Sequence, residues 1–401
     1  MKPSTAMIVG GGIAGPITAV ALRRAGIDAT IYEAYPRTAD GVGAMLSLAP
    51  NGINALRAIG FDATTLGEAV DTMIIAGSNG RPLGTFPTLG GLPASRVLWR
   101  SELYRALSEY AVANGVRFVY GKRLVEIKDT AELIVAHFAD GDWVSADVLI
   151  GADGIRSTVR SLIDANAPQP RHVGHVGFGG LATDSGFRGL PRTMYFANGK
   201  RAFMGYWTQA DGNTAWFANV PHAEAMTNAE ARETSSEEWL RCLRDLFADD
   251  RPGRDLLAHT DASTLVVAGS GEMLPSVPRW YKGRAVLVGD AAHAPSSSSG
   301  QGASMAAESA VELARCLRDI PYRSEAFAAY EALRRPRVEK VAAFGARNNQ
   351  DKVAGPVAKA LMRVMMPIAM KTFLTPEKMF GWMHGHQTDW EATVEWPSLA
   401  A

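Results

Sequence analysis

The sequence predicts an α/β fold in which a parallel-sheet framework is interrupted by an inserted, mostly antiparallel β-sheet, an α+β arrangement. Residues 6–9 form a short apolar run ended by three glycines, which is typical of a buried parallel strand. Residues 14–25 follow with a helical pattern, and residues 28–33 predict a second strand. Residues 285–288 form another buried strand, so the framework resumes after the insertion.

The change of pattern along the chain sets the expected start of the insertion. We expect residues 1–170 to form the first part of the framework, with a short excursion into the inserted domain at residues 71–98. Residues 171–220 are rich in glycine and aromatic residues and alternate like exposed-face strands, so they predict the inserted sheet, and we expect the inserted domain to span residues 171–264. Asp211-Gly212 marks a hairpin turn within it, and Ser235-x-x-Glu238 predicts the start of a helix.

The C-terminal part is expected to return to the framework and then leave it. Residues 265–350 predict the second part of the framework, and residues 351–401 predict a C-terminal helical segment. Within that segment, residues 354–374 have an amphipathic pattern. It favours a helix docked across the domains over one lying on a membrane surface.

The bulk properties limit the classes of partner. A chain of 401 residues suits two or three domains, and its 41 basic and 41 acidic residues cancel, which argues against nucleic acid as the main partner. We find no apolar stretch long enough to span a membrane and no leader pattern, so a cytoplasmic location is expected. The histidines show no metal-ligand spacing, so no metal is expected. Both a monomer and a homodimer fit the sequence.

The glycine motif between the first strand and the first helix predicts a dinucleotide site. In Gly10-x-Gly12-x-x-Gly15, the first glycine permits a tight turn, the second admits a pyrophosphate, and the third allows close helix packing. The helix N-terminus offers free N–H groups and a positive dipole end. Glu33, at the end of the second strand, can accept a hydrogen bond from a ribose hydroxyl. This Rossmann-like reading competes with a glycine-rich structural turn, and it does not separate FAD from NAD.

Two later motifs resemble a known family. Residues 151–160, Gly-Ala-Asp-Gly-Ile-Arg-Ser-Thr-Val-Arg, resemble the Asp-Gly motif of the class A flavoprotein monooxygenases, the para-hydroxybenzoate hydroxylase-like group. Residues 289–293, Gly-Asp-Ala-Ala-His, resemble the Gly-Asp motif of that family and continue into Gly300-Gln301-Gly302. All three motifs occur in the family's order over residues 5–345. The resemblance implies a Rossmann-like FAD-binding domain with an inserted substrate domain.

The resemblance also implies roles for individual residues. Asp290 is expected at the ribityl chain, and Arg100 at the flavin phosphates or the ribityl chain, with a surface arginine as the alternative. The helix that starts near Ala303 is expected to point its N-terminus at the flavin ring. Together with the glycine motif, the expected FAD contacts are Gly10, Gly12, Ile13, Ala14, Gly15, Glu33, Ala34, Arg100, Leu124, Asp153, Gly154, Gly289, Asp290, Pro295, Gly300, Gly302, Ala303 and Ser304.

The sequence departs from the family pattern at two positions. Many members have a proline six residues after the Gly-Asp aspartate, whereas this chain has Ser296 there and Pro295 one residue earlier. Ser304 replaces a frequent asparagine. These changes put a phenol activation of the para-hydroxybenzoate type in doubt, but they do not affect the residues on which FAD binding depends.

The resemblance implies a monooxygenase reaction. NADH or NADPH would reduce FAD, and one oxygen atom of O2 would reach a small organic substrate through a flavin hydroperoxide. An aromatic or polycyclic substrate and hydroxylation are expected first, and epoxidation or ketone oxygenation stays open. The alternative is an oxidoreductase of the same fold that forms or reduces C=C bonds without oxygen insertion. A carrier protein and a plain NAD dehydrogenase are remoter alternatives.

No residue is assigned as a catalytic acid, base or nucleophile. Arg156 and Arg160 are expected either to help the nicotinamide donor dock or to be structural. The substrate is expected between the flavin and the sheet of residues 171–220. Alternation places Phe203 and Trp207 on one face of that sheet and Met204 and Tyr206 on the other. The expected substrate contacts are Arg201, Met204, Tyr206 and Trp216, with core packing as the alternative for each aromatic residue.

Overall fold

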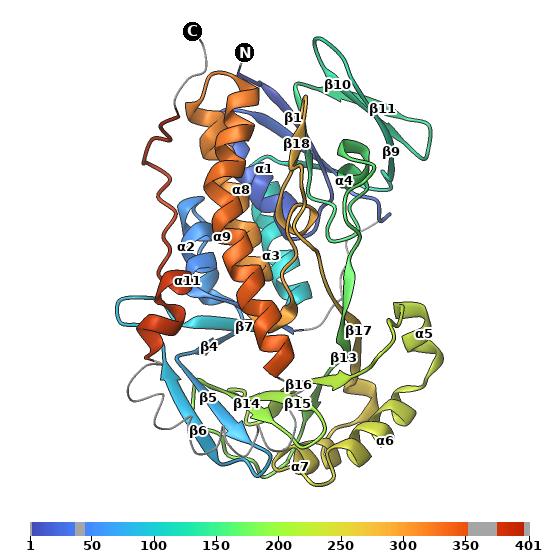
Figure 1. The fold of residues 1–401 in the computed structure, drawn as a ribbon, viewed down its shortest axis with the longest axis vertical. Helices are drawn as coiled ribbons and strands as arrows, with labels where there is room; N and C mark the ends of the chain where they lie inside the picture. The colour runs from blue at the N-terminus through green and yellow to red at the C-terminus, as the bar shows by residue number, and fades with distance from the viewer. Residues whose placement is uncertain (1, 37–44, 352–374, 397–401) are drawn as a thin grey trace.

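The structure is a computed structural model, and it describes residues 2–36, 45–351 and 375–396. A parallel β-sheet with helices beside it occupies one end of the molecule, and a larger sheet occupies the other end (Figure 1). This architecture confirms the predicted mixed α/β fold with an inserted, mostly antiparallel sheet.

The first sheet carries the glycine-rich loop. Its strand order is β18-β19-β12-β1-β2-β8, and every neighbouring pair is parallel except β18 with β19. Val148, Leu149 and Ile150 are fully buried, as expected for a central strand that is covered on both faces. The strands are β1 (Thr5–Val9), β2 (Asp28–Tyr32), β8 (Arg117–Val119), β12 (Val148–Gly151), β18 (Tyr281–Lys282) and β19 (Ala285–Leu287).

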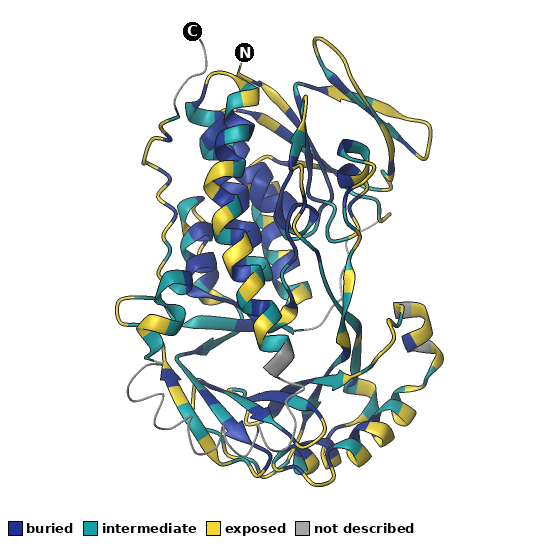
Figure 2. Ribbon diagram, viewed as in Figure 1, coloured by how far each residue is buried: buried dark blue, intermediate teal, exposed yellow. Residues whose placement is uncertain are grey.

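Helices pack beside this sheet, and α8 is the central one. It contacts α1, α2 and α9, and most of its residues are buried (Figure 2). A small sheet of β9, β10 and β11 and the short helix α4 complete this part of the molecule. The bounds are α1 (Ala14–Arg24), α2 (Pro50–Ala58), α3 (Arg100–Ala113), α4 (Thr158–Ile163), α8 (Gly302–Asp319), α9 (Arg323–Asp351), β9 (Leu124–Asp129), β10 (Ile134–Phe138) and β11 (Trp143–Ala146).

The second sheet has seven strands in the order β17-β13-β16-β15-β14-β5-β6. All neighbours are antiparallel except β14 with β5. The predicted turn at Asp211-Gly212 joins β15 to β16 as an antiparallel hairpin, and Gly212 has φ +88°. The strands are β5 (Thr72–Gly77), β6 (Pro82–Pro87), β13 (Arg171–Ala182), β14 (Thr193–Asn198), β15 (Phe203–Thr208), β16 (Thr214–Pro221) and β17 (Val266–Met273).

One expected domain boundary lies too early. We expected the framework to resume at residue 265, but β17 still belongs to the second sheet, because it pairs with β13. The chain rejoins the first sheet only at β18. The short excursion expected at residues 71–98 contains β5 and β6, which form the far edge of the second sheet. Sequence alternation cannot tell to which of two sheets a strand belongs.

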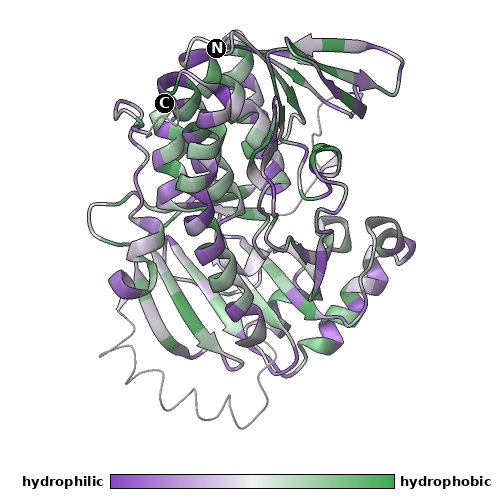
Figure 3. Cartoon of the chain, turned by 45° about the horizontal axis from the view of Figure 1, so that its top comes forward, coloured by the Kyte–Doolittle hydropathy of each residue, from purple (hydrophilic) through white to green (hydrophobic). Residues whose placement is uncertain are grey.

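Three helices cover one face of the second sheet. The hydroxyl of Ser235 accepts a hydrogen bond from the N–H of Glu238 at 3.2 Å, so the predicted helix start is confirmed. Leu240, Leu243 and Phe247 are buried against the strands, whereas hydrophilic residues cover the outside (Figure 3). These helices are α5 (Asn228–Glu233), α6 (Ser236–Leu246) and α7 (Gly253–Ala258).

A small sheet in the order β3-β7-β4 lies between the two larger parts. β7 runs directly into α3, so it delivers Arg100 to the first helical position. Met45 of β3 packs against the second sheet, because a Cβ built on Gly179 would lie 3.5 Å from the Met45 methyl carbon. The strands are β3 (Met45–Leu48), β4 (Glu68–Val70) and β7 (Ser95–Trp99).

The C-terminal segment, residues 375–396, runs beside the helices of the first sheet (Figure 1). It begins with a π-helical turn (Glu377–Gly381) and α11 (Trp382–His384). The guanidinium groups of Arg24 and Arg318 each lie 4.9 Å from the ring centre of Trp390, and this fixes the extended end. The amphipathic helix expected at residues 354–374 lies outside the described residues. No helix among those described is long and apolar enough to cross a membrane.

The close approach of α2 to α8 generates a stability prediction. A Cβ built on Gly52 of α2 would lie 2.5 Å from the Ser304 hydroxyl oxygen of α8, and backbone of α8 lies beside it. We expect Gly52→Ala to separate the helices and to lower the free energy of unfolding by about 2 kcal/mol. Gly90→Ala is the matched control, because a Cβ there meets no atom within 4 Å. Equal unfolding midpoints for both variants in urea would contradict this packing.

Candidate functional site

The glycine-rich loop has the geometry that a bound pyrophosphate needs. Gly10 has φ +104°, and a Cβ there would lie 2.5 Å from the carbonyl oxygen of Ala152. A Cβ on Gly15 would overlap the carbonyl oxygen of Gly10, whereas one on Gly12 would meet nothing within 4 Å. The first and third glycines therefore serve packing, and the space beside Gly12 stays free for a ligand. Ile13 precedes Ala14 at the start of α1.

Glu33 braces this loop from the end of β2. Its carboxylate accepts hydrogen bonds from the N–H of Gly11 at 2.7 Å and from the N–H of Tyr35 at 2.9 Å. The expected bond to a ribose hydroxyl stays a prediction. Ala34 is half-buried beside it, and Leu124 is buried in the core at the start of β9.

The structure places Arg100 close enough to Asp290 for their charges to interact, although the two residues are far apart in the sequence. Asp290 lies in a single turn of 3-10 helix, Gly289–Ala291, just after β19. Desolvation raises the pKa of the Asp290 carboxyl, and the nearby charge of Arg100 acts against that shift. A carboxylate and a guanidinium at this sheet edge can bind the hydroxyl and phosphate groups of one extended ligand.

The Asp-Gly motif mainly holds α4 in place. Asp153 accepts hydrogen bonds from the Ser157 hydroxyl at 2.5 Å and from the N–H of Val159 at 3.0 Å, and burial raises its pKa. Gly154 has φ +78°, which suits glycine in the following turn. The motif therefore fixes the loop that follows β12.

The surroundings of Arg160 favour the structural role over the alternative of docking the nicotinamide donor. Arg160 is 1% exposed, and it donates hydrogen bonds to the carbonyl oxygens of Ile155 at 2.7 Å and Ala291 at 3.1 Å. It thus ties α4 to the Gly-Asp turn and cannot meet a molecule from solvent. Arg156 is exposed, and it forms an ion pair with Glu272 at 2.8 Å.

The loop before α8 forms the last part of the predicted cofactor site. Gly300 has φ +63° and ends a 3-10 turn at Ser297–Ser299, while Gly302 and the adjoining Ala303 begin α8. A Cβ on either glycine would meet nothing within 4 Å. Ser304 faces away, because its hydroxyl accepts a hydrogen bond from the N–H of Ala49 at 3.0 Å.

The position at which the chain departs from the family is buried. Ser296 has no exposed surface, and its hydroxyl lies 2.8 Å from the amide nitrogen of Asn349 in α9. Pro295 lines a cavity of about 360 Å³ together with His293, Trp280 and residues of α9. That cavity adjoins the Gly-Asp turn but includes no residue of the glycine-rich loop, so it is not the cofactor cradle.

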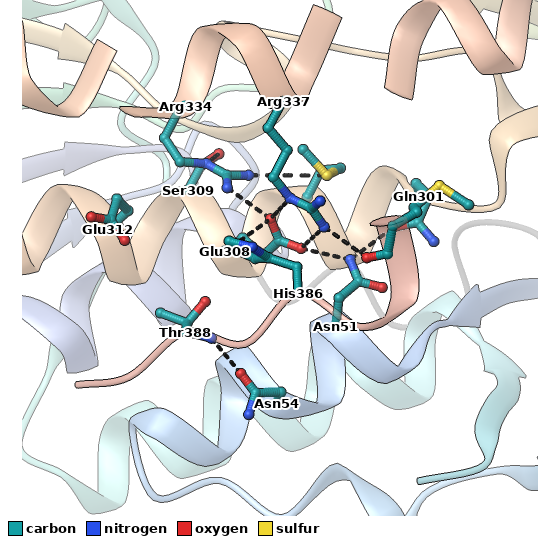
Figure 4. Close-up of polar contacts among 12 residues, drawn as sticks. Asn51, Asn54, Gln301, Glu308, Ser309, Glu312, Arg334, Arg337, His386 and Thr388 are labelled. Atoms are coloured by element: carbon teal, nitrogen blue, oxygen red, sulfur yellow. Dashed lines mark hydrogen bonds and ion pairs between the residues drawn. The ribbon is translucent and has the colours of Figure 1, made fainter. Parts of the chain in front are cut away.

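A buried charge cluster lies behind this loop, and the sequence analysis missed it (Figure 4). The fully buried Glu308 carboxylate lies 2.7 Å from both Arg334 and Arg337 of α9. These arginines hold the pKa of Glu308 at about 2 against the effect of burial. The available signal was an acidic residue within an otherwise buried helix pattern, followed by the run Arg334-Arg335-Pro336-Arg337.

The structure places the expected substrate contacts on the face of the second sheet that helices cover. Met204, Tyr206 and Trp216 are buried against α6 and α7. Arg201 lies on the same helix-covered side, where its guanidinium is 3.4 Å from the carboxylate of Asp245 in α6. The opposite face packs toward the β3-β7-β4 sheet and carries the aromatic residues Phe196, Phe203, Trp207 and Phe217.

The C-terminal segment contacts β6, the edge strand of the second sheet. The rings of Phe380 and Phe86 lie 5.8 Å apart edge to face, and His384 stacks on Phe380 at 5.3 Å. Burial lowers the pKa of His384 to about 4. Arg337 donates hydrogen bonds to the carbonyl oxygens of Trp382 and Met383 at 3.0 and 2.8 Å. The charge cluster therefore anchors a segment that reaches the second sheet.

The different surroundings of the loop glycines generate a prediction. We expect Gly15→Ala to lower the thermal stability of the protein without FAD, because the new methyl group overlaps the Gly10 carbonyl. Gly12→Ala should leave that stability nearly unchanged and weaken FAD binding, because its methyl group fills only the free space. Thermal unfolding and fluorescence titration with FAD measure the two effects. The reverse pattern would refute this assignment of roles.

The charge cluster generates a pH prediction. Because folding lowers the pKa of Glu308 from 4.5 to about 2, its ionised form adds stability above pH 4.5, which is lost as the pH falls toward 2. Glu308→Gln should cost about 3 kcal/mol near neutral pH, since two buried arginines lose their counter-charge. The difference from the unmodified protein should shrink in acid, as measured by urea unfolding. Glu126→Gln, on an exposed strand, should show no such trend.

Comparisons with known proteins agree with this geometry. The family model described as FAD binding domain matches residues 4–345. The chain is 31% identical to an aurachin C monooxygenase/isomerase of Stigmatella aurantiaca, over 90% of this chain and 94% of that protein. It is also 31% identical to a FAD-dependent urate hydroxylase of Klebsiella pneumoniae, over 83% and 86% of the two chains.

Solved structures show the same fold. A variant of HpxO from Klebsiella pneumoniae, complexed with FAD, superposes with a TM-score of 0.78 at 25% identity, covering 92% of this chain and 98% of that one. A salicylate hydroxylase substrate complex superposes with a TM-score of 0.74 at 21% identity, over 92% and 95% of the two chains. The family model spans most of the sequence, and its ligand fits the open loop at Gly12 and the position of Asp290 near the charge of Arg100. The chain therefore belongs to the FAD-binding family of class A flavoprotein monooxygenases.

Proposed function

We propose that this enzyme uses FAD and NADH or NADPH to insert one oxygen atom from O2 into a small aromatic or heterocyclic substrate. The observation that carries the proposal is the aromatic face of the second sheet, formed by Phe196, Phe203, Trp207 and Phe217. Such a surface suits a flat organic ring. The names of the relatives support this substrate class, since they include a urate hydroxylase and a 6-hydroxynicotinate 3-monooxygenase.

FAD supplies the electron transfer and the oxygen chemistry when it is bound. The chain contributes binding, orientation and exclusion of water. The open backbone at Gly12 and the N-terminus of α1 suit the pyrophosphate, and Asp290 with Arg100 suits the hydroxyl-bearing chain. The N-terminus of α8 favours negative charge beside Gly302. The aromatic face limits access of water to the reacting atoms.

The histidine of the Gly-Asp motif does not act as a charged group near neutral pH. His293 lies beside Ser309 at 2.8 Å, and burial lowers its pKa to about 3, so it is neutral near pH 7. Within residues 2–36, 45–351 and 375–396, no three His, Cys, Asp or Glu side chains are grouped as a metal site. A reaction carried by the cofactor needs neither a metal nor a nucleophile from the chain.

The proposal is tested by oxygen consumption and mass spectrometry. Purified FAD-loaded protein is mixed with NADH or NADPH and a panel of hydroxylated benzoates, pyridines and purines under isotopically labelled O2. We expect NAD(P)H oxidation that requires O2 and a product that carries one labelled oxygen atom. Turnover of a substrate without O2 would instead support the C=C oxidoreductase. Lack of any reaction with O2 and NAD(P)H would refute the proposal.

The corrected sheet face gives a further prediction. Phe217→Ala removes an aromatic ring from the face that we assign to the substrate. We expect more of the oxidised NAD(P)H to end as hydrogen peroxide, by about tenfold, because water reaches the flavin more easily. Arg201→Ala is the control, since that side chain pairs with Asp245 on the helix-covered side. A larger rise in hydrogen peroxide from Arg201→Ala than from Phe217→Ala would instead support Arg201 as a substrate contact.

A further inference from the structure

The side chain of Gln301 has a fixed orientation at the start of α8. It lies between Gly300 and Gly302 and is 1% exposed. Its Oε1 atom accepts a hydrogen bond from Nδ2 of Asn51 at 2.9 Å. The other end of the amide, Nε2, is therefore a donor, and its side chain makes no second hydrogen bond within the part of the chain that the structure describes.

This orientation follows from the charge cluster. Nδ2 of Asn51 also donates to the carboxylate of Glu308 at 2.6 Å. An ionised carboxylate can only accept hydrogen bonds, so Asn51 must turn its NH2 group toward it. The same NH2 group faces Gln301, which must then present its carbonyl oxygen (Figure 4). Glu308 thus sets the direction of both amides.

Glu308 keeps its acceptor role over a wide pH range. Arg337 contacts both carboxylate oxygens at 2.7 and 2.8 Å, and Arg334 adds a third contact at 2.7 Å. These cations hold the pKa of Glu308 at about 2. The carboxylate is therefore ionised near neutral pH, and the hydrogen bonds keep their direction there.

The two amides differ in whether their unpaired atoms can be reached from outside the protein. The Oδ1 atom of Asn51 is buried and has no hydrogen-bond partner, although Asn51 has no exposed surface. Folded proteins pair nearly all buried polar atoms of this kind. Oδ1 of Asn51 is closed off by the protein itself, whereas the unpaired Nε2 of Gln301 keeps accessible surface, so Nε2 is the donor that a bound group can reach.

We propose that Nε2 of Gln301 donates a hydrogen bond to the pyrimidine end of the bound flavin ring, and that Asn51 and Glu308 are positioning residues for it. The pyrimidine end offers carbonyl oxygens as acceptors, which match the unused donor of Gln301. The inference rests on the proposed placement of Gly300 and Gly302 at the flavin ring. Its consequence is electrostatic, because the pyrimidine end gains negative charge when the flavin is reduced.

Sulfite provides a test that needs no substrate. Its sulfur lone pair forms a bond to the flavin N5 atom, the ring takes up the negative charge, and the visible absorbance disappears. In FAD-loaded protein, we expect Gln301→Leu to weaken sulfite binding by about tenfold, because one donor to a charged acceptor is lost. Gln301→Glu should weaken it further, since it adds a negative charge at the same place. The reduction potential of the flavin should become more negative in both variants.

A double-mutant cycle tests the positioning role. Asn51→Leu should weaken sulfite binding in the otherwise unchanged protein and have no further effect in the Gln301→Leu background. Asn54→Ala is the matched control, because Asn54 lies on the same helix but accepts from the N–H of Thr388. It should leave sulfite binding unchanged.

The possible outcomes separate this inference from the proposed function. Unchanged sulfite affinity and potential in both Gln301 variants would show that Gln301 only holds α2 against α8. Fully additive effects of Asn51→Leu would overturn the positioning role of Asn51. If the unmodified protein retains no FAD, the cofactor site itself is wrong. If Gln301→Leu does not fold, Gln301→Glu takes its place in the sulfite test. Circular dichroism and the FAD content then check that Gln301→Glu is folded and loaded with cofactor.

Discussion

The carboxylate of Glu308 has no exposed surface, and four parts of the chain depend on it. Two arginines of α9 neutralise it, Asn51 of α2 donates to it, and His386 of the C-terminal segment lies 3.8 Å away. Removing the carboxylate alone, or both arginines without the carboxylate, would leave an uncompensated ion in the interior, which costs several kcal/mol. The positions of α2, α8, α9 and residues 382–386 are therefore coupled, and the loop at Gly300 lies at one end of this coupled unit.

The site combines a rigid part and a variable part. The cofactor loop is rigid because its glycines are packed against backbone atoms, as at Gly10 and Ala152. The second sheet is mostly antiparallel, and α6 and α7 cover one of its faces, so the proposed substrate side is the other face. Relatives with different named substrates share this framework. We infer that substrate choice lies in the aromatic face and in the segment that carries Phe380.

Much of the framework could be predicted because its signals are local. The run 6–9, the glycines after it and Glu33 lie within one β-α-β unit, so spacing alone gave the strand, the turn and the helix. The hairpin at Asp211-Gly212 and the helix start at Ser235 depend on turn and capping chemistry, which is local too. The motif at Asp290 was recognisable, but its approach to Arg100 required the fold.

The sequence by itself determined the α/β framework, the glycine loop and the FAD family, because each follows from short-range spacing or motif order. Alternation also determined that Met204 and Tyr206 lie opposite Phe203 and Trp207. Only the tertiary structure decided which pair is covered, because the position of α6 and α7 does not follow from the period of a strand. In the same way, only the fold buried Arg160 and joined Glu308 to Asn51, since both depend on contacts between residues that are distant in the sequence.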